Sequence, residues 1–175
     1  MPNYRRNRVP GGTYFFTVNL LERRRSLLVD HIDGLRTSIR KTRNKMPFHI
    51  DAWVILPDHM QCIWTLPENH DNYSSRWQSI KKEFSKSIPA YEYRSEARIK
   101  NNERGIWQSR FWEYTIRDEL VYCRHIDYIH FNLVKHGLVR TVKDWPHSTF
   151  HRLVELGVYQ PEWGEVALLD DYIRP

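Results

Sequence analysis

The chain is 175 residues long and 41% hydrophobic, which is typical of one globular domain that buries its own core. Lysine and arginine (27) outnumber aspartate and glutamate (21), and the formal net charge of +6 favours an anionic polymer as partner. Two cysteines exclude a disulfide framework, and no apolar run approaches the roughly 20 residues of a membrane span, so we expect no membrane partner and a cytoplasmic location.

The first part of the chain predicts one strand, one helix and a pair of strands. Residues 12–21 (GTYFFTVNLL) follow a glycine pair and are rich in β-branched and aromatic types, which predicts a strand. Apolar residues recur at helical spacing over 32–45 and predict a helix. The segments 48–56 (FHIDAWVIL) and 59–66 (HMQCIWTL) predict two strands, and the short connection between them favours an antiparallel hairpin.

A second helix and a long loop are expected next. Ser75 and Gln78 resemble a capping box, and apolar residues continue at helical spacing to about residue 89. Residues 90–105 show no clear period, which predicts a long basic loop.

The remaining elements complete the fold prediction. A fourth strand is expected at 111–116, followed by a third helix that begins after Asp118 as N-cap and ends at Gly137. The order β-α-β-β-α-β-α predicts an α+β fold, a ferredoxin-like split βαββαβ antiparallel sheet with one additional helix. We expect a single domain over 1–155, and residues 156–175 form a tail to which the sequence assigns no role.

Basic and aromatic residues favour a nucleic acid as the anionic partner. Seven tryptophans, ten tyrosines and seven phenylalanines could stack on unpaired bases beside a basic groove. The alternative is that the aromatic residues form the core and the charges are solvated surface.

The strand at 59–66 carries two side chains that could bind a metal. Side chains alternate between the faces of a strand, so His59 and Gln61 share one face. We expect this pair to face outward, close enough at roughly 3.3 Å per residue to bind one ion, while the other face packs on a core. The alternative is a histidine near a turn and a surface glutamine without a ligand.

The third helix carries a tyrosine and an amide on one stripe. Arg124, Tyr128 and Asn132 are each four residues apart and therefore lie on the same side of the helix, with His125 and Lys135 beside them. An amide oxygen one turn beyond a phenol places a hard metal ligand next to a possible nucleophile. The alternative is a half-buried tyrosine and a surface asparagine.

Several motifs occur in order over roughly residues 4–155: GGTYFFTVNL, AWVILPDHMQCIWTLPE, SSRWQSIKKEF, WQSRFWEYTIRD, HIDYIHFNLVKHG and DWPHSTFHR. In these motifs the chain resembles the REP-associated tyrosine transposases, which are bacterial single-tyrosine HUH endonucleases. The resemblance implies metal-dependent cleavage and transfer of single-stranded DNA at REP-like hairpins through a 5′-phosphotyrosine intermediate. By position, it implies Tyr128 as the nucleophile and His59, Gln61 and Asn132 as the ligands of Mg²⁺ or Mn²⁺.

Two positions depart from the family pattern. Gln61 stands where the family usually has a second histidine, and Leu133 follows Asn132 where a proline is usual. An amide oxygen still suits Mg²⁺ or Mn²⁺, but the change leaves open a catalytically impaired protein that binds DNA hairpins. A third interpretation is an RNA-binding module on the same fold, although such modules place aromatic residues on the exposed face of the sheet.

The resemblance also suggests a DNA-binding surface. The region from Gly11 to Asn19 is the candidate for reading nucleotides at the foot of the hairpin. Basic side chains would hold phosphates, so affinity should fall with salt. A monomer associated with the nucleoid is the expected form. The residues expected to contact DNA are Arg5, Arg6, Arg8, Gly11, Gly12, Thr13, Tyr14, Arg23, Arg24, Arg25, Lys81, Lys82 and Lys135.

Overall fold

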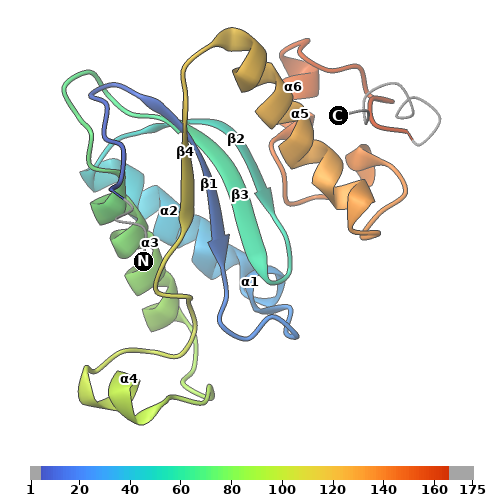
Figure 1. The fold of residues 1–175 in the computed structure, drawn as a ribbon. Coiled ribbons are helices and arrows are strands. Elements are labelled where there is room, and N and C mark those ends of the chain that lie inside the picture. The colour runs from blue at the N-terminus through green and yellow to red at the C-terminus, as the bar shows by residue number, and fades with distance from the viewer. Residues whose placement is uncertain (1–4, 166–175) are drawn as a thin grey trace.

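The computed structural model describes residues 5–165 and contains a four-stranded antiparallel sheet of order β2-β3-β1-β4 (Figure 1). Its strands are β1 (Thr13–Asn19), β2 (His49–Ile55), β3 (His59–Thr65) and β4 (Trp112–Ile116). The helices are α1 (Leu27–Asp30), α2 (Ile32–Lys45), α3 (Tyr73–Ser87), α4 (Glu96–Lys100), α5 (Glu119–Lys135), the 3₁₀ turn η1 (Val142–Asp144) and α6 (Phe150–Glu155). The strand order and the crossing helices confirm the ferredoxin-like α+β prediction.

One face of the sheet packs on α2 and α3. The apolar side chains of β3 on this side, among them Cys62 and Trp64, are fully buried, as the alternation in the sequence predicts. Trp64 stacks on Trp77 of α3 with ring centroids 4.3 Å apart. Each large side chain buried in this way contributes roughly 1.5–3 kcal/mol.

The opposite face packs on α5 and α6, which Figure 1 shows on the other side of the sheet from α2 and α3. Ile63 of β3 and Ile129 of α5 are fully buried in this second core. The helix α5 lies over β2 and β3. His59 and Gln61 are therefore 6% exposed each, and the expectation that they face outward is wrong because α5 covers them.

Two local predictions are also wrong. Asn72, rather than a Ser75–Gln78 capping box, caps α3, because its side chain accepts a hydrogen bond from the Ser75 backbone N–H at 3.0 Å. The segment 90–105 is not wholly a loop, because Ser95 caps the short helix α4.

The residues after 155 continue the second core as far as the structure describes them. Tyr159 is 7% exposed, and its hydroxyl donates to Asp127 of α5 at 2.8 Å. The packed body therefore extends beyond the domain end expected at residue 155, whereas 166–175 of the expected tail lie outside the described residues. No helix within 5–165 is long and apolar enough to cross a membrane.

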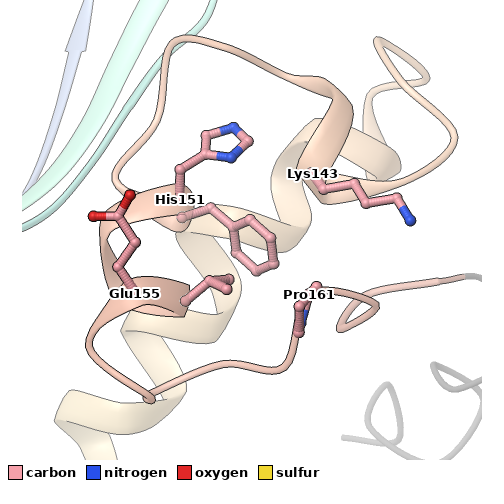
Figure 2. Close-up of a pocket in the computed structure, with 6 residues that line it drawn as sticks. Lys143, His151, Glu155 and Pro161 are labelled. Atoms are coloured by element: carbon pink, nitrogen blue, oxygen red, sulfur yellow. The ribbon is translucent and has the colours of Figure 1, made fainter.

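A hollow of about 230 Å³ lies beside α6 (Figure 2). Lys143, His151 and Glu155 carry the polar groups around it. Figure 2 shows Lys143 and Glu155 extending in different directions, so these charges do not converge on a common point.

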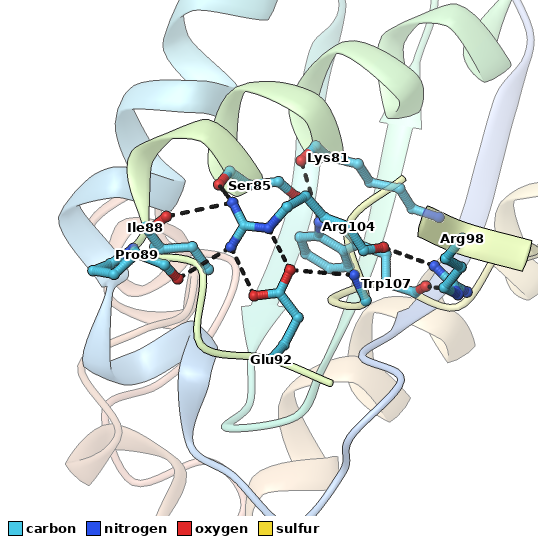
Figure 3. A network of polar contacts seen from close by, with 9 residues as sticks. Lys81, Ser85, Ile88, Pro89, Glu92, Arg98, Arg104 and Trp107 are labelled. Atoms are coloured by element: carbon cyan, nitrogen blue, oxygen red, sulfur yellow. Dashed lines mark hydrogen bonds and ion pairs between the residues drawn. The ribbon is translucent and has the colours of Figure 1, made fainter. Parts of the chain in front are cut away.

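The segment between α3 and β4 is fastened by two arginines (Figure 3). Arg104 forms a two-pronged ion pair with Glu92, and its guanidinium also donates to the carbonyl oxygens of Ser85 and Pro89. Arg98 donates to the carbonyl oxygens of Arg104 and Trp107. The segment is thereby fixed to the end of α3.

The two edges of the sheet differ. Residues 147–149 cover β2, where the Ile55 N–H donates to the His147 carbonyl at 3.0 Å and the Thr149 N–H donates to the Trp53 carbonyl at 2.9 Å. Within the described residues, β4 has β1 as its only strand neighbour.

Candidate active site

His59 is held by its neighbour Asp58. The His59 Nδ1 lies 2.7 Å from Asp58 Oδ1, and Arg23 Nε donates to Asp58 Oδ2 at 2.7 Å. Because Nδ1 carries the proton in this hydrogen bond, the lone pair of His59 lies on Nε2. A carboxylate behind the imidazole is the usual support of a metal-binding histidine.

The charges of this pair agree with a neutral imidazole. Desolvation lowers the pKa of His59, and this effect outweighs the hydrogen bond that His59 donates to Asp58, which raises the pKa. Desolvation alone would raise the pKa of Asp58, but the hydrogen bonds with His59 and Arg23 bring it below its ordinary value. His59 is therefore in the form that binds metal ions.

Gln61 and Asn132 meet between the sheet and α5. The Asn132 Nδ2 donates a short hydrogen bond to Gln61 Oε1, and both side chains are buried. The second amide atom of Asn132, Oδ1, is buried and has no hydrogen-bond partner among the described residues. An unpaired buried oxygen is costly, so this atom suits a cation.

Tyr128 lies on the face of the sheet that carries His59 and Gln61. Its ring meets Phe15 of β1 edge-on at 6.3 Å, and Phe15 is paired with Ile63, two residues from Gln61. Lys135 Nζ lies 5.7 Å from the ring centroid. Tyr128 is 44% exposed, so its hydroxyl is accessible to a polymer that binds from solvent.

His136 and Asp58 join the site although the sequence did not single them out. The rings of His136 and His59 are 5.7 Å apart and nearly perpendicular. His136 follows Asn132 by four residues, and this spacing could have placed it on the stripe of Tyr128 and Asn132. The signal for Asp58 was its position at the turn just before His59.

A hollow of about 250 Å³ opens beside His59, and arginines gather at its mouth. Its lining includes Arg23, Arg24, Arg25, Asp58, His59 and His136. Arg24 and Arg25 are exposed. The hollow combines two imidazoles and one carboxylate with three arginines, and the arginines suit a phosphate.

The other expected DNA contacts lie in different environments. Tyr14 is fully buried and its hydroxyl bonds to the backbone of Val9, which leaves no ring surface for DNA and contradicts a direct contact by this side chain. Lys81 is held against the Gln108 carbonyl at 3.0 Å, and desolvation lowers its pKa to about 8. Among the remaining residues, Arg5, Arg8 and Lys82 are exposed.

Several residues near the N-terminus that were expected to contact DNA have structural roles in the fold. Gly11 has a φ of +67°, and a Cβ on Gly12 would lie 2.8 Å from the Val9 carbonyl oxygen. The Thr13 hydroxyl lies 2.9 Å from that of Thr65. Arg6 lies over the Phe111 ring at 3.9 Å and pairs with Glu113.

His59 and the amides of Gln61 and Asn132 are the metal-binding groups expected from the sequence, and His136 adds a second imidazole beside His59. The described residues contain no group of three or more His, Cys, Asp or Glu side chains that could hold a metal ion. A cation here would depend on His59, Gln61 and Asn132, and hard amide oxygens suit Mg²⁺ or Mn²⁺. The unpaired Asn132 oxygen fits this requirement.

The comparisons with known proteins agree over nearly the whole chain. No family model matches. The chain is 50% identical over 168 residues to the REP-associated tyrosine transposase of Escherichia coli, covering 95% of this chain and 94% of the relative. It is 46% identical over 166 residues to a Haemophilus influenzae protein of the same description, with 94% of each covered.

A solved structure is also similar. It is described as a REP-associated tyrosine transposase bound to a REP hairpin, and it matches with a TM-score of 0.82 and 49% identity over 93% of this chain and 91% of that chain. At these identities and coverages, the chain belongs to the REP-associated tyrosine transposases, a family of enzymes.

Proposed function

We propose that the protein cleaves and rejoins single-stranded DNA at REP-like hairpins through a 5′-phosphotyrosine intermediate, with a divalent metal ion as cofactor. The observation that carries the proposal is the meeting of Asn132 and Gln61, which joins the Tyr128 helix to the His59 strand. The relative that is bound to a REP hairpin supports a hairpin as the substrate.

The chemistry is an exchange of one phosphate ester for another. The Tyr128 oxygen attacks the phosphorus and loses its proton, the bond from phosphorus to the 3′ oxygen breaks, and that oxygen leaves as a 3′-hydroxyl. The phosphotyrosine conserves the ester, so a 3′-hydroxyl can later reverse the reaction without a nucleotide cofactor.

The protein would supply position and charge. His59 and the two amides would hold Mg²⁺ or Mn²⁺, which when bound polarises the scissile phosphate. Asp58 keeps His59 in the tautomer that has its lone pair on Nε2. The arginines at the hollow offset the charge of neighbouring phosphates, and α5 fixes Tyr128 over β1.

A second candidate function is hairpin binding without cleavage. Gln61 Oε1 already accepts the hydrogen bond from Asn132 Nδ2, and this contact competes with metal binding. A histidine at position 61 would offer a stronger nitrogen donor.

The test is a covalent adduct between the protein and a hairpin oligonucleotide in Mn²⁺ or Mg²⁺, resolved on a denaturing gel. We expect an adduct with the wild-type chain and none with Tyr128→Phe. Tyr91→Phe is a matched control, because Tyr91 is 80% exposed and distant in sequence from every site residue.

Gln61→His separates the two functions. An adduct that appears only in Gln61→His, with equal hairpin binding by both chains, would show that the natural chain is a binding protein. Absence of both adduct and hairpin binding in the wild-type chain would contradict both functions, and a preference for a matched RNA hairpin would favour an RNA-binding module.

A further inference from the structure

Trp112 and Tyr114 of β4 are unusually exposed on the face of the sheet that carries the site. Trp112 is 59% exposed and Tyr114 is 44% exposed. The register places Trp112 opposite Thr17 of β1, and Thr17 opposite Gln61 of β3. Trp112 therefore lies in one row with Gln61, two strands away, at a backbone separation of roughly 10 Å.

The packing of α5 explains why this part of the sheet is open. The helix lies over β2 and β3, whereas β4 is at the edge beyond β1. The ring of Tyr114 is stacked on His125 of α5, with centroids 5.2 Å apart and an angle of 15°. The indole of Trp112, by contrast, contacts no other aromatic ring or cation within residues 5–165.

Three arginines lie near these rings in the sequence. Arg110 precedes Trp112 by two residues, Arg117 follows β4, and Arg124 lies one helical turn before Tyr128. All three arginines are exposed, and none forms an ion pair among the described residues. An exposed indole flanked by unpaired arginines matches the chemistry of single-stranded nucleic acid, whose bases stack and whose phosphates are negative.

We propose that Trp112 is a stacking site for one unpaired base of the DNA strand that flanks the scissile phosphate, with Tyr114 and His125 as the wall beside it. The inference rests on the proposed function for the identity of the strand. It also gives the DNA strand a path across the protein, from the His59 hollow past Tyr128 to the β4 edge of the sheet. A base in this place would be held by the flat indole face, and its neighbouring phosphates by the arginines.

The test pairs a protein variant with a base removed from the DNA. Binding is measured by fluorescence anisotropy, in EDTA so that no cleavage occurs, with REP-like hairpins that carry a short single-stranded flank on either side or none. Trp112→Ala should weaken binding of one flanked hairpin by roughly 5- to 100-fold and leave the hairpin without a flank unchanged. An abasic residue at one flank position should weaken binding to the wild-type chain by a similar factor and have no further effect in Trp112→Ala.

Two variants serve as controls. Leu120→Ala removes another side chain that is 60% exposed, at the start of α5, and should leave all affinities unchanged. Trp112→Phe keeps a ring and should retain most of the affinity for the flanked hairpin. Thermal unfolding should be the same for all these chains, because the substituted side chains are exposed.

Three results would overturn the inference. The first is an equal loss for flanked and unflanked hairpins, the second is no loss in Trp112→Ala, and the third is a dimer that Trp112→Ala dissociates, which would assign the indole to a second copy. If the wild-type chain forms the covalent adduct while Trp112→Ala binds normally, the inference fails alone. If the wild-type chain binds no hairpin, both the inference and the proposed function fail.

Discussion

Asp58 accepts hydrogen bonds from Arg23 and His59 and so determines which nitrogen of the histidine faces the hollow. The imidazole alone could present either nitrogen. The carboxylate fixes the tautomer, and the arginine keeps the carboxylate in place. Arg23, expected from the sequence to hold phosphate, therefore has part of its guanidinium committed to Asp58.

Asp58→Asn should weaken the binding of Mn²⁺ by about 10- to 100-fold, because supporting partners of metal ligands usually contribute that much. Isothermal titration with Mn²⁺ alone measures the effect without any reaction. Asp30→Asn, which alters an exposed carboxylate on α1, is the matched control. Equal Mn²⁺ affinity in all three chains would show that Asp58 does not position His59.

The residue pattern predicted which side chains share a face, but it could not show what lies above that face. The alternation in β3 correctly separates His59 and Gln61 from Cys62 and Trp64. The burial of the polar pair depends on α5, which is distant in sequence. The contact between Gln61 and Asn132 likewise joins residues 71 positions apart, and spacing within one element cannot reveal it.

Helix α5 is the element that brings the nucleophile to the sheet. Its first turn is capped by Asp118, whose side chain accepts from the Val121 N–H at 2.9 Å. Near the same end, Tyr122 donates to Asp51 of β2 at 2.8 Å. The buried face of the helix, around Ile129, sets its rotation, so the half-exposed Tyr128 lies at the margin of the second core, with its ring against Phe15 of β1.

Asp118→Ala should lower the free energy of unfolding by about 1 kcal/mol, as expected for the loss of an N-cap. It should also slow adduct formation several-fold, because fraying at this end loosens the helix that carries Tyr128. Asn72→Ala removes the N-cap of α3 and is the control: stability should fall by a similar amount while the adduct rate stays unchanged. An equal slowing in both variants would assign the effect to global stability.

The segment that contains α4 depends on the ion pair between Glu92 and Arg104. The hydrogen bond with Arg104 lowers the pKa of Glu92 to about 2, although burial opposes the shift. The folded pKa lies below the ordinary value of 4.5, so the stabilisation is complete above about pH 4.5 and is lost as pH falls toward 2.

Glu92→Gln should therefore lower the free energy of unfolding by about 2 kcal/mol at pH 7, and the difference from wild type should shrink steadily as pH falls from about 4.5 to about 2. Urea unfolding over this pH range measures both quantities. Glu96→Gln changes an exposed carboxylate on α4 and should show neither effect. A difference that stays constant with pH would contradict an ionic contribution from Glu92.

At the level of elements, strong periodic patterns were informative and short polar ones were not. The hairpin of β2 and β3 and the cap of α5 follow from alternation, turn length and Asp118. The cap of α3 was misplaced, because Asn72 and Ser75 are both good N-cap residues and only the backbone decides between them. The short helix α6 offered too few turns for a helical period to be visible.

Across the whole molecule, the two layers of helices have different tasks. The layer of α2 and α3 closes an aromatic core, and the layer of α5 and α6 closes a second core while leaving β4 open. The order of the predicted helices and strands along the chain was enough to predict the sheet. It could not predict which part of the sheet α5 leaves uncovered, because that depends on the packing of Ile129 and Leu133 against the strands.

The covered β2 edge also limits how copies of the protein can join. Hydrogen bonds with residues 147–149 occupy main-chain groups of Trp53 and Ile55 in β2, and the Arg152 guanidinium donates to the Ile50 carbonyl, so β4 is the edge that is open to another strand. When the β4 edges of two copies pair with each other, both outer edges of the joined sheet are covered β2 edges, and no further copy can be added. Fibre growth by strand addition is therefore blocked by this architecture, and the longest continuous sheet that two such domains could share has eight strands, twice the four of one chain.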